Sequence, residues 1–302
     1  MKFGYNYSSQ WSQEPFHYSK GHVLEFLSKI NMDCLEIQLA VVRIMDRNGN
    51  INKIQKKEFI KLLKKYRIKV GSVHAPYPYY VQSYLNLKKG KLHKKAIKCL
   101  KNSVDTANEL NAKIVVIHPS HTLGFHKDDK VYEKSITENI IKNLSLIRDY
   151  IESKKYDIKI GIETMASKKD RVIVGDKPSE IVRIIKALDS KQIGATWDMC
   201  HTYKSSMKYK LKINHFKELA KHTCHIHYSS FSPIFSQCHC PTEYGKEKPI
   251  HKMISLLENY NGIVINEISP LMLIYLNPKR TLEEWLKLVL KQSRGDFKKW
   301  MR

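Results

Sequence analysis

Six short apolar segments of this chain each end on a side chain that can bind a divalent metal ion. The segments are rich in β-branched residues, which is typical of buried parallel strands. Their last residues are, in chain order, His74, His118, Glu163, Asp198, His227 and Glu267. Room for one helix separates each ending from the next. The pattern therefore predicts repeated strand–helix units whose strands all end at one edge.

Apolar periodicity and turn residues together indicate eight such units. Strands are predicted near residues 2–7, 34–40, 69–76, 113–119, 158–165, 193–199, 222–229 and 262–268. Helices are predicted near residues 20–31, 55–66, 91–110, 133–153, 177–189, 212–220, 248–260 and 281–293. Asn111 stands where a helix should stop, and Pro178 stands where one should start. These turn residues thus fall where the apolar periodicity places the helix ends.

Eight parallel strands joined by right-handed helical crossovers close into a (β/α)8 TIM barrel, an α/β fold whose active site lies at the C-terminal ends of the strands. No linker or shift in composition divides the chain, so we expect residues 1–302 to form a single domain. An open doubly wound sheet is the alternative fold. It would need a glycine-rich phosphate loop after the first strand, and residues 5–10 contain no glycine.

The chain is strongly basic, with 53 Lys and Arg against 29 Asp and Glu and a net charge of +24. Such a charge favours polyanions or phosphorylated substrates. The other interpretation is that lysine-rich stretches such as 61–65 and 88–95 form the solvated faces of helices. Whether Lys204, Lys208 and Lys210 contact phosphate stays open.

The sequence indicates a cytoplasmic protein without a membrane partner. No apolar stretch is long enough to span a bilayer, and residues 1–7 are typical of a strand, not of a signal peptide. The six cysteines suit a reducing compartment better than a disulfide scaffold. The cluster Cys238-His239-Cys240 lacks the second pair of ligands that a structural zinc site needs.

Carboxylates and imidazoles that converge on one point suit Mn²⁺, Co²⁺ or Zn²⁺ better than Ca²⁺ or Mg²⁺. We expect one ion to be held by the four later strand endings, Glu163, Asp198, His227 and Glu267. His74 and His118 follow neighbouring strands, and they could hold a second ion that shares Glu163. His201 lies one turn after Asp198, and it would point into the same mouth if the strand continues into a turn.

Two further residues are candidates for binding substrate. Tyr77 could stack on a sugar or a base, although it could equally pack within its own proline-rich turn. His225 lies on the same face of its strand as His227. We prefer His227 as the metal ligand because it is nearer the C-terminal end of the strand, which leaves His225 for the substrate.

These segments resemble the xylose isomerase-like TIM barrels, which include sugar isomerases or epimerases and the endonuclease IV class of abasic-site nucleases. The resemblance covers residues 2 to about 270. Its carriers are Ser72–Tyr77, Val116–Pro119, Gly161–Thr164, Trp197–Thr202, His225–His227 and Asn266–Glu267.

The epimerase pattern implies one metal ion on the four later strand endings and a small sugar or sugar phosphate as substrate. Glu163 and Glu267 would then also act as the acid/base pair, moving a proton through an enediolate. Such epimerases often carry an arginine soon after the strand-seven histidine, and this chain has Ser229–Pro233 there.

The nuclease pattern implies three zinc ions and DNA as the partner. His74, His118 and Glu163 would hold the first, the four later strand endings the second, and His201 with an Asp-x-His pair the third. Here that pair is Gln237 and His239. This departure makes the epimerase the first expectation from sequence, with the nuclease as the alternative. A scaffold that binds polyanions without catalysis is the third possibility.

Overall fold

The computed structural model describes residues 1–7, 11, 18–46, 48–76, 85–119, 130–167, 173–232, 237–245 and 247–301. Eight parallel strands form a closed barrel in the order β1-β10-β7-β6-β5-β4-β3-β2. Their bounds are Lys2–Tyr7 (β1), Cys34–Gln38 (β2), Val70–His74 (β3), Ile114–Ile117 (β4), Lys159–Glu163 (β5), Ile193–Asp198 (β6), Thr223–Tyr228 (β7) and Ile263–Asn266 (β10). The predicted (β/α)8 barrel is confirmed.

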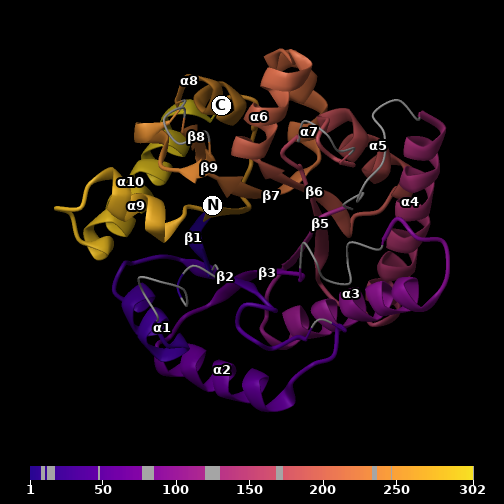
Figure 1. Ribbon diagram of the computed structural model, residues 1–302, viewed down its shortest axis with the longest axis horizontal. Helices are drawn as coiled ribbons and strands as arrows, with labels where there is room; N and C mark the ends of the chain where they lie inside the picture. Colours follow the sequence, from indigo (N-terminus) through magenta and orange to yellow (C-terminus); the bar gives the residue numbers. More distant parts are fainter. Residues whose placement is uncertain are drawn as a thin grey trace.

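Helices surround this ring of strands (Figure 1). They are Lys20–Ser28 (α1), Lys53–Lys65 (α2), Lys91–Glu109 (α3), Lys130–Ser153 (α4), Pro178–Leu188 (α5), Met199–Tyr209 (α6), Lys217–Lys221 (α7), Glu247–Ile254 (α8), Pro270–Leu276 (α9) and Leu282–Trp300 (α10). Two 3-10 turns, Ile213–Phe216 and Thr242–Tyr244, precede α7 and α8. Within the described ranges, no helix is both long and apolar enough to cross a membrane.

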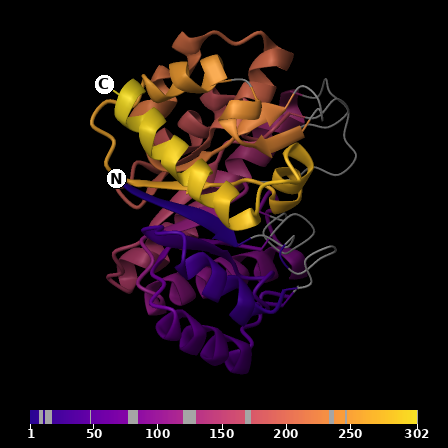
Figure 2. The same cartoon turned by 90° about the vertical axis from the view of Figure 1, so that its left-hand side faces the viewer.

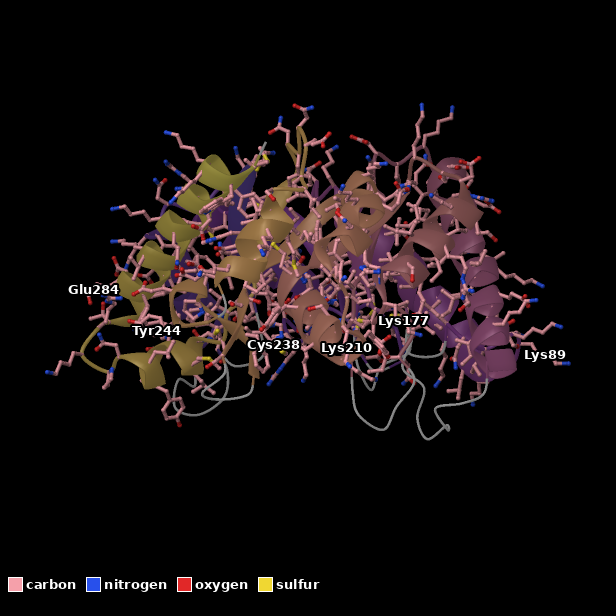
Figure 3. The ribbon with its side chains drawn as sticks, turned by 90° about the horizontal axis from the view of Figure 1, so that it is seen from above. Lys89, Lys177, Lys210, Cys238, Tyr244 and Glu284 are labelled. Atoms are coloured by element: carbon pink, nitrogen blue, oxygen red, sulfur yellow. The ribbon has the colours of Figure 1, made fainter. Side chains whose placement is uncertain are left out.

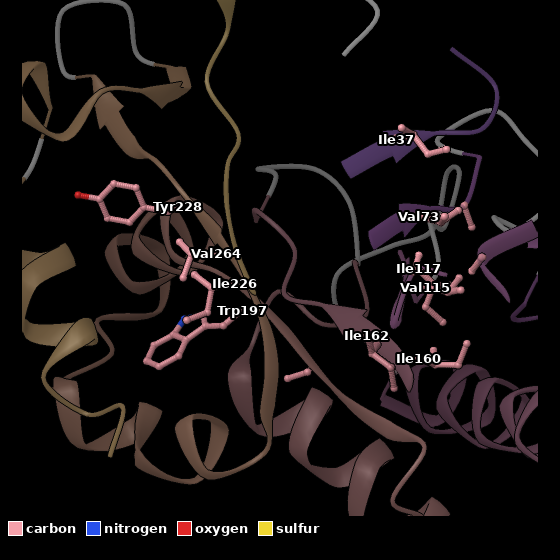
Figure 4. Packing of buried hydrophobic residues seen from close by; sticks show 14 of the residues in the cluster. Ile37, Val73, Val115, Ile117, Ile160, Ile162, Trp197, Ile226, Tyr228 and Val264 are labelled. Carbon is pink, nitrogen blue, oxygen red and sulfur yellow. The ribbon is translucent and has the colours of Figure 1, made fainter. Parts of the chain in front are cut away.

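Alternation along the strands separates an outer apolar layer from the barrel interior. Side chains such as Ile117, Ile162 and Ile226 belong to the large core cluster between strands and helices (Figure 4). The residues that alternate with them point inward. Five of these form a separate apolar cluster inside the barrel: Cys34, Ile114, Val116, Ile263 and Ile265. The remaining inward positions, toward the C-terminal ends, are polar.

Several elements differ from the sequence prediction. The sequence analysis predicted no helix between the sixth strand and residues 212–220, but α6 lies there. The buried residues of α6 are Met199, Cys200, Thr202 and Ser205, so its apolar periodicity is weak. A two-stranded antiparallel sheet, β8 (Ser230–Ser232) with β9 (Gln237–Cys240), was not predicted because its strands are short and polar. The helix predicted near 248–260 ends at Ile254.

The last helix is longer than predicted. α10 starts with a capping box, in which Thr281 and Glu284 satisfy each other's backbone N–H groups, and it continues to Trp300. It packs along β1 and β10, as the view of the barrel wall shows (Figure 2). The N-terminal strand is therefore covered by the C-terminal helix.

Candidate metal centre

Six of the eight predicted ligand residues, the strand endings, lie together at the C-terminal edge of the barrel. Five of them are buried, and the Glu267 side chain is 15% exposed. Glu163, at the end of β5, is contacted by residues from strands on both sides. Because parallel strands end at the same edge, the regular pattern along the sequence becomes one compact group of side chains.

The first cluster consists of His74, His118 and Glu163. The Nε2 atoms of the two histidines lie 3.1 and 3.0 Å from Glu163 Oε2. His74 Nδ1 is 2.8 Å from the carbonyl oxygen of Ala75, which fits an Nδ1–H donor and leaves Nε2 as the coordinating atom. Three neighbouring strands thus supply one potential binding site.

The second cluster consists of Glu163, Asp198, His227 and Glu267, whose ligand atoms all lie within 4.8 Å of one another. His227 Nδ1 is 2.9 Å from Glu267 Oε2, 3.6 Å from Glu163 Oε1 and 4.0 Å from Asp198 Oδ2. One imidazole nitrogen therefore faces three carboxylates.

The third cluster consists of Asp198, His201 and His239. His201 Nδ1 lies 3.3 Å from Asp198 Oδ2, and the His201 and His239 rings meet edge to face with centroids 5.2 Å apart. His239 comes from β9, and its Nδ1 lies 3.0 Å from the carbonyl oxygen of Glu267. Asp198 thus supplies this cluster with a carboxylate, whereas the nuclease pattern has its aspartate at the position of Gln237.

The three clusters share residues. Glu163 belongs to the first and second, and Asp198 belongs to the second and third. Glu163 turns Oε2 toward the first cluster and Oε1 toward the second, whereas Asp198 turns the same oxygen, Oδ2, toward both the second and the third. The arrangement is one chain of ligand sets across the mouth of the barrel.

Buried polar atoms in the second cluster fit a divalent ion. Asp198 Oδ2, His227 Nδ1 and Glu267 Oε2 are buried, and within the part of the chain that the structure describes they are held by ion-pair contacts with His227 or His201 and make no hydrogen bond. Buried polar atoms normally have a partner, and a cation between these three would provide one. Oxygen and imidazole donors together match zinc, manganese or cobalt.

The charges of the cluster are strongly coupled. Burial alone would raise the pKa of Glu163, but the charges of His118 and His227 outweigh it and hold that pKa well below its usual value. Burial likewise opposes protonation of His227, but the carboxylates of Glu36, Glu267 and Glu163 raise its pKa well above the usual value. Burial raises the pKa of Asp198. In the absence of an ion, protons on histidine balance the carboxylates.

One buried residue of this region was missed by the sequence analysis. Glu36, in the middle of β2, is fully buried inside the barrel and contacts both His225 and His227. A carboxylate within a mostly apolar strand was the available signal, but Glu36 is not at a strand end and so did not fit the pattern that selected the other residues.

The two candidates for substrate binding have different outcomes. His225 is fully buried, and its Nε2 lies 3.0 Å from Glu36 Oε2, so it sits one layer below the ligand clusters. Its role toward substrate stays a prediction. Tyr77 lies outside the described residues.

Residues 24–289 match the family model described as xylose isomerase-like TIM barrel. The chain belongs to this family. Among curated relatives, a probable endonuclease 4 of Pediococcus pentosaceus is 30% identical over 159 residues, which are 52% of this chain and 48% of the relative. An uncharacterized protein of Methanocaldococcus jannaschii is 28% identical over 146 residues, which are 48% of this chain and 46% of the relative. The chain thus spans about half the length of these curated relatives.

Two solved structures match nearly the whole chain. D-psicose 3-epimerase in the presence of D-fructose has a TM-score of 0.71 at 15% identity, covering 98% of this chain and 99% of the other. The IOLI protein with a binding zinc atom has a TM-score of 0.70 at 16% identity, covering 99% of both chains. At these identities, the likeness shows a shared fold.

Proposed function

We propose that this protein is a metal-dependent nuclease that hydrolyses DNA at abasic sites. The observation that carries the proposal is the overlap of three ligand clusters through Glu163 and Asp198. A sugar epimerase that uses one ion needs only the second cluster. A centre with several ions would also use the buried His74 and His118 and the His239 of the third cluster.

The geometry changes the order of preference that the sequence alone suggested. Gln237 stands where the nuclease pattern carries an aspartate, and that departure favoured the epimerase. Asp198 Oδ2, however, lies 3.3 Å from His201 Nδ1 and belongs to the same cluster as His239. A carboxylate is therefore available to the third cluster without an aspartate at position 237.

When bound, divalent ions would activate a water molecule and neutralise charge on a phosphate group. Glu163 and Asp198 would hold neighbouring ions at fixed separation because each belongs to two clusters. Glu267, at the rim of the mouth, has a pKa of about 2; burial opposes ionisation, but His227 and His239 outweigh it. It is thus ionised at neutral pH and can accept a hydrogen bond from an incoming water molecule.

Positive charge near the mouth suits a polyanionic substrate. The protein has a net charge of +24, and Lys177 and Lys210 lie along the same edge as Cys238, which precedes the candidate ligand His239 (Figure 3). Lysines on this edge would attract the DNA backbone in a salt-dependent way. The curated relative from Pediococcus pentosaceus, named a probable endonuclease 4, supports the same substrate class.

A sugar epimerase is the second candidate, and one observation favours it. Glu163 and Glu267 both approach His227 Nδ1, at 3.6 and 2.9 Å, so two carboxylates flank the point where a ketose could bind. Such a pair could remove and return a proton on a sugar. This candidate requires one ion, and DNA would not be its substrate.

The deciding experiment compares His118→Gln with the wild type. His118 belongs to the first cluster alone, so the substitution leaves the four residues of the second cluster in place. We expect incision of a duplex with one abasic site to fall by about a hundredfold or more, and bound zinc to fall by one ion. His22→Gln, which removes an exposed histidine on α1, is the matched control and should incise like the wild type.

The opposite result is equally specific. If the wild type binds one ion, leaves abasic DNA intact and exchanges protons between solvent and a ketose, the epimerase is correct. In that case His118→Gln should have little effect on the exchange.

A further inference from the structure

Glu36 is a buried carboxylate that the proposed reaction does not use. It lies in the middle of β2 with no exposed surface. Asn6 Nδ2 and Ser72 Oγ each donate a hydrogen bond to it, at 2.7 Å. His225 Nε2 lies 3.0 Å from Oε2, and His227 Nε2 lies 3.1 Å from Oε1. Four side chains therefore converge on one carboxylate.

The strand register explains this convergence. Glu36 pairs with Asn6 of β1 on one side and with Ser72 of β3 on the other, so the three residues occupy one layer of the barrel. The register shifts at Leu35/Glu36, just where the carboxylate enters the interior. His225 and His227 reach the same layer from β7.

A charged layer at this depth is unusual for a TIM barrel, whose interior is generally filled by branched apolar side chains. A buried carboxylate is unfavourable unless hydrogen bonds and opposite charges compensate for the lost water. Here each of the four side chains around Glu36 can donate a hydrogen bond to its carboxylate. The layer lies directly beneath the metal-ligand clusters. Its position points to a task connected with those clusters.

The orientation of His227 identifies that task. Its Nε2 faces Glu36, whereas its Nδ1 faces the carboxylates of the second cluster, with Glu267 Oε2 at 2.9 Å. A histidine that binds a metal through one nitrogen usually donates its other N–H to a carboxylate or a carbonyl group. That donor fixes both the tautomer and the ring orientation.

We propose that Glu36 is a positioning residue of the metal centre, whose carboxylate accepts the Nε2 proton of His227 and so directs the Nδ1 lone pair into the second cluster. The inference rests on the metal centre that both candidate functions share. It does not depend on which reaction that centre performs.

The same geometry argues against Glu36 as a metal ligand itself. Glu36, His225 and His227 are close enough together to form a site. Both oxygens of the carboxylate, however, already accept hydrogen bonds, Oε1 from Asn6 and Oε2 from Ser72. An ion between these residues would displace donors that are already well placed, so the group functions as a support for His227.

The test measures Zn²⁺ affinity in Glu36→Gln, by competition with a chromophoric chelator. Glutamine has the shape of glutamate, but its amide nitrogen is a donor and would face other donors. We expect the affinity of the second cluster to fall about tenfold to a hundredfold. The first cluster, which lacks His227, should keep its affinity. The titration is repeated with Glu36→Gln combined with His118→Gln, which damages the first cluster. The difference separates zinc binding at the second cluster from zinc binding at the first.

Ser72→Ala is the matched control, since it removes one donor to Glu36 and leaves the carboxylate and both histidines. Its effect on the second cluster should be smaller than that of Glu36→Gln. The visible spectrum of bound Co²⁺ gives a second readout, because a rotated His227 changes the coordination geometry. A general loosening of the barrel would weaken the first and second clusters alike.

Wild-type affinity in Glu36→Gln, or equal weakening of both clusters, overturns the proposal. If Glu36→Gln does not unfold cooperatively, Glu36→Asp decides instead, since it keeps the charge but withdraws the oxygens by one methylene. Unchanged affinity of the second cluster in that variant also overturns the proposal. If the wild-type protein binds no divalent ion, the proposed function fails too. If the wild type binds metal and only the Glu36 variants behave differently from expectation, the role of Glu36 alone is wrong.

Discussion

Asp198 contacts His201 twice, once at its backbone N–H and once at its imidazole ring. Its Oδ1 accepts a hydrogen bond of 2.7 Å from the backbone N–H of His201, and its Oδ2 lies 3.3 Å from the Nδ1 of the same residue. Asp198 is therefore the N-cap of α6 and a potential ligand in two clusters at once. The two roles use different oxygens, and substitutions can separate them.

Asp198→Asn should lose metal without losing the helix cap. Asparagine caps helices about as well as aspartate, so the free energy of unfolding without metal should stay within about 1 kcal/mol of the wild type. Zinc content should fall because two clusters lose a carboxylate. Asp198→Ala removes the cap as well and should cost about 1 kcal/mol more. Metal analysis and thermal unfolding check both, and full zinc content in Asp198→Asn would contradict the ligand role.

Zinc binding should release protons at neutral pH. Despite burial, neighbouring carboxylates raise the pKa of His227 and of His201 well above the usual value, so both are protonated without metal. Coordination requires the unprotonated nitrogen. Apparent affinity should therefore decrease as the pH falls. Calorimetry in two buffers with different protonation enthalpies measures the number of protons released.

His118 provides the control for this proton release. Burial lowers its pKa, so it is already neutral at pH 7. His201→Gln should reduce the number of protons released, whereas His118→Gln should not change the protons released per ion at the remaining clusters. Equal proton release in both variants would count against this assignment of charges.

Gly161→Ala should destabilise the barrel beside Glu163. An added Cβ at position 161 would lie 2.2 Å from Thr196 Oγ1 on the neighbouring strand. Overpacking of this kind typically costs about 1–3 kcal/mol. Urea unfolding measures the loss. Adding Thr196→Ala to Gly161→Ala removes the oxygen that the new Cβ meets, so the double variant should recover part of the stability. Adding Thr196→Ser instead keeps that oxygen and should recover none.

Thr281→Ala should weaken the attachment of α10. Thr281 Oγ1 accepts a hydrogen bond from the backbone N–H of Glu284, and Glu284 Oε2 accepts one from the backbone N–H of Thr281. Loss of such a cap costs about 1 kcal/mol. Thr281→Ser keeps the hydroxyl and should be close to the wild type in thermal unfolding. No difference between the two variants would show that packing on β1 and β10 alone holds the helix.

The barrel and the six strand endings could be predicted because both depend on a regular signal. Apolar strands recur once per unit, and a parallel barrel necessarily brings their ends together. The roles of Asp198 toward His239 and of Glu36 toward His227 could not be predicted in this way. Both depend on contacts between residues far apart in sequence, which the spacing of residues along one strand does not encode.

Local composition explains the elements that were missed. α6 buries small or polar residues such as Thr202 and Ser205, so its apolar stripe is weak. The β8–β9 pair is short and polar, yet it carries His239 into the third cluster. The third cluster, which most distinguishes the two candidate functions, therefore depends on β9, a strand that apolar periodicity does not predict.

The sharing of Glu163 and Asp198 has a consequence for how such a centre can change over time. His118 and His239 each serve a single cluster, so a lineage can lose either one while the four residues at the middle stay intact. Loss of both peripheral histidines would thus convert a centre of three clusters into a centre for one ion. Replacement of either shared carboxylate would disable two neighbouring positions in one step, which makes these two residues the ones that selection can least easily alter.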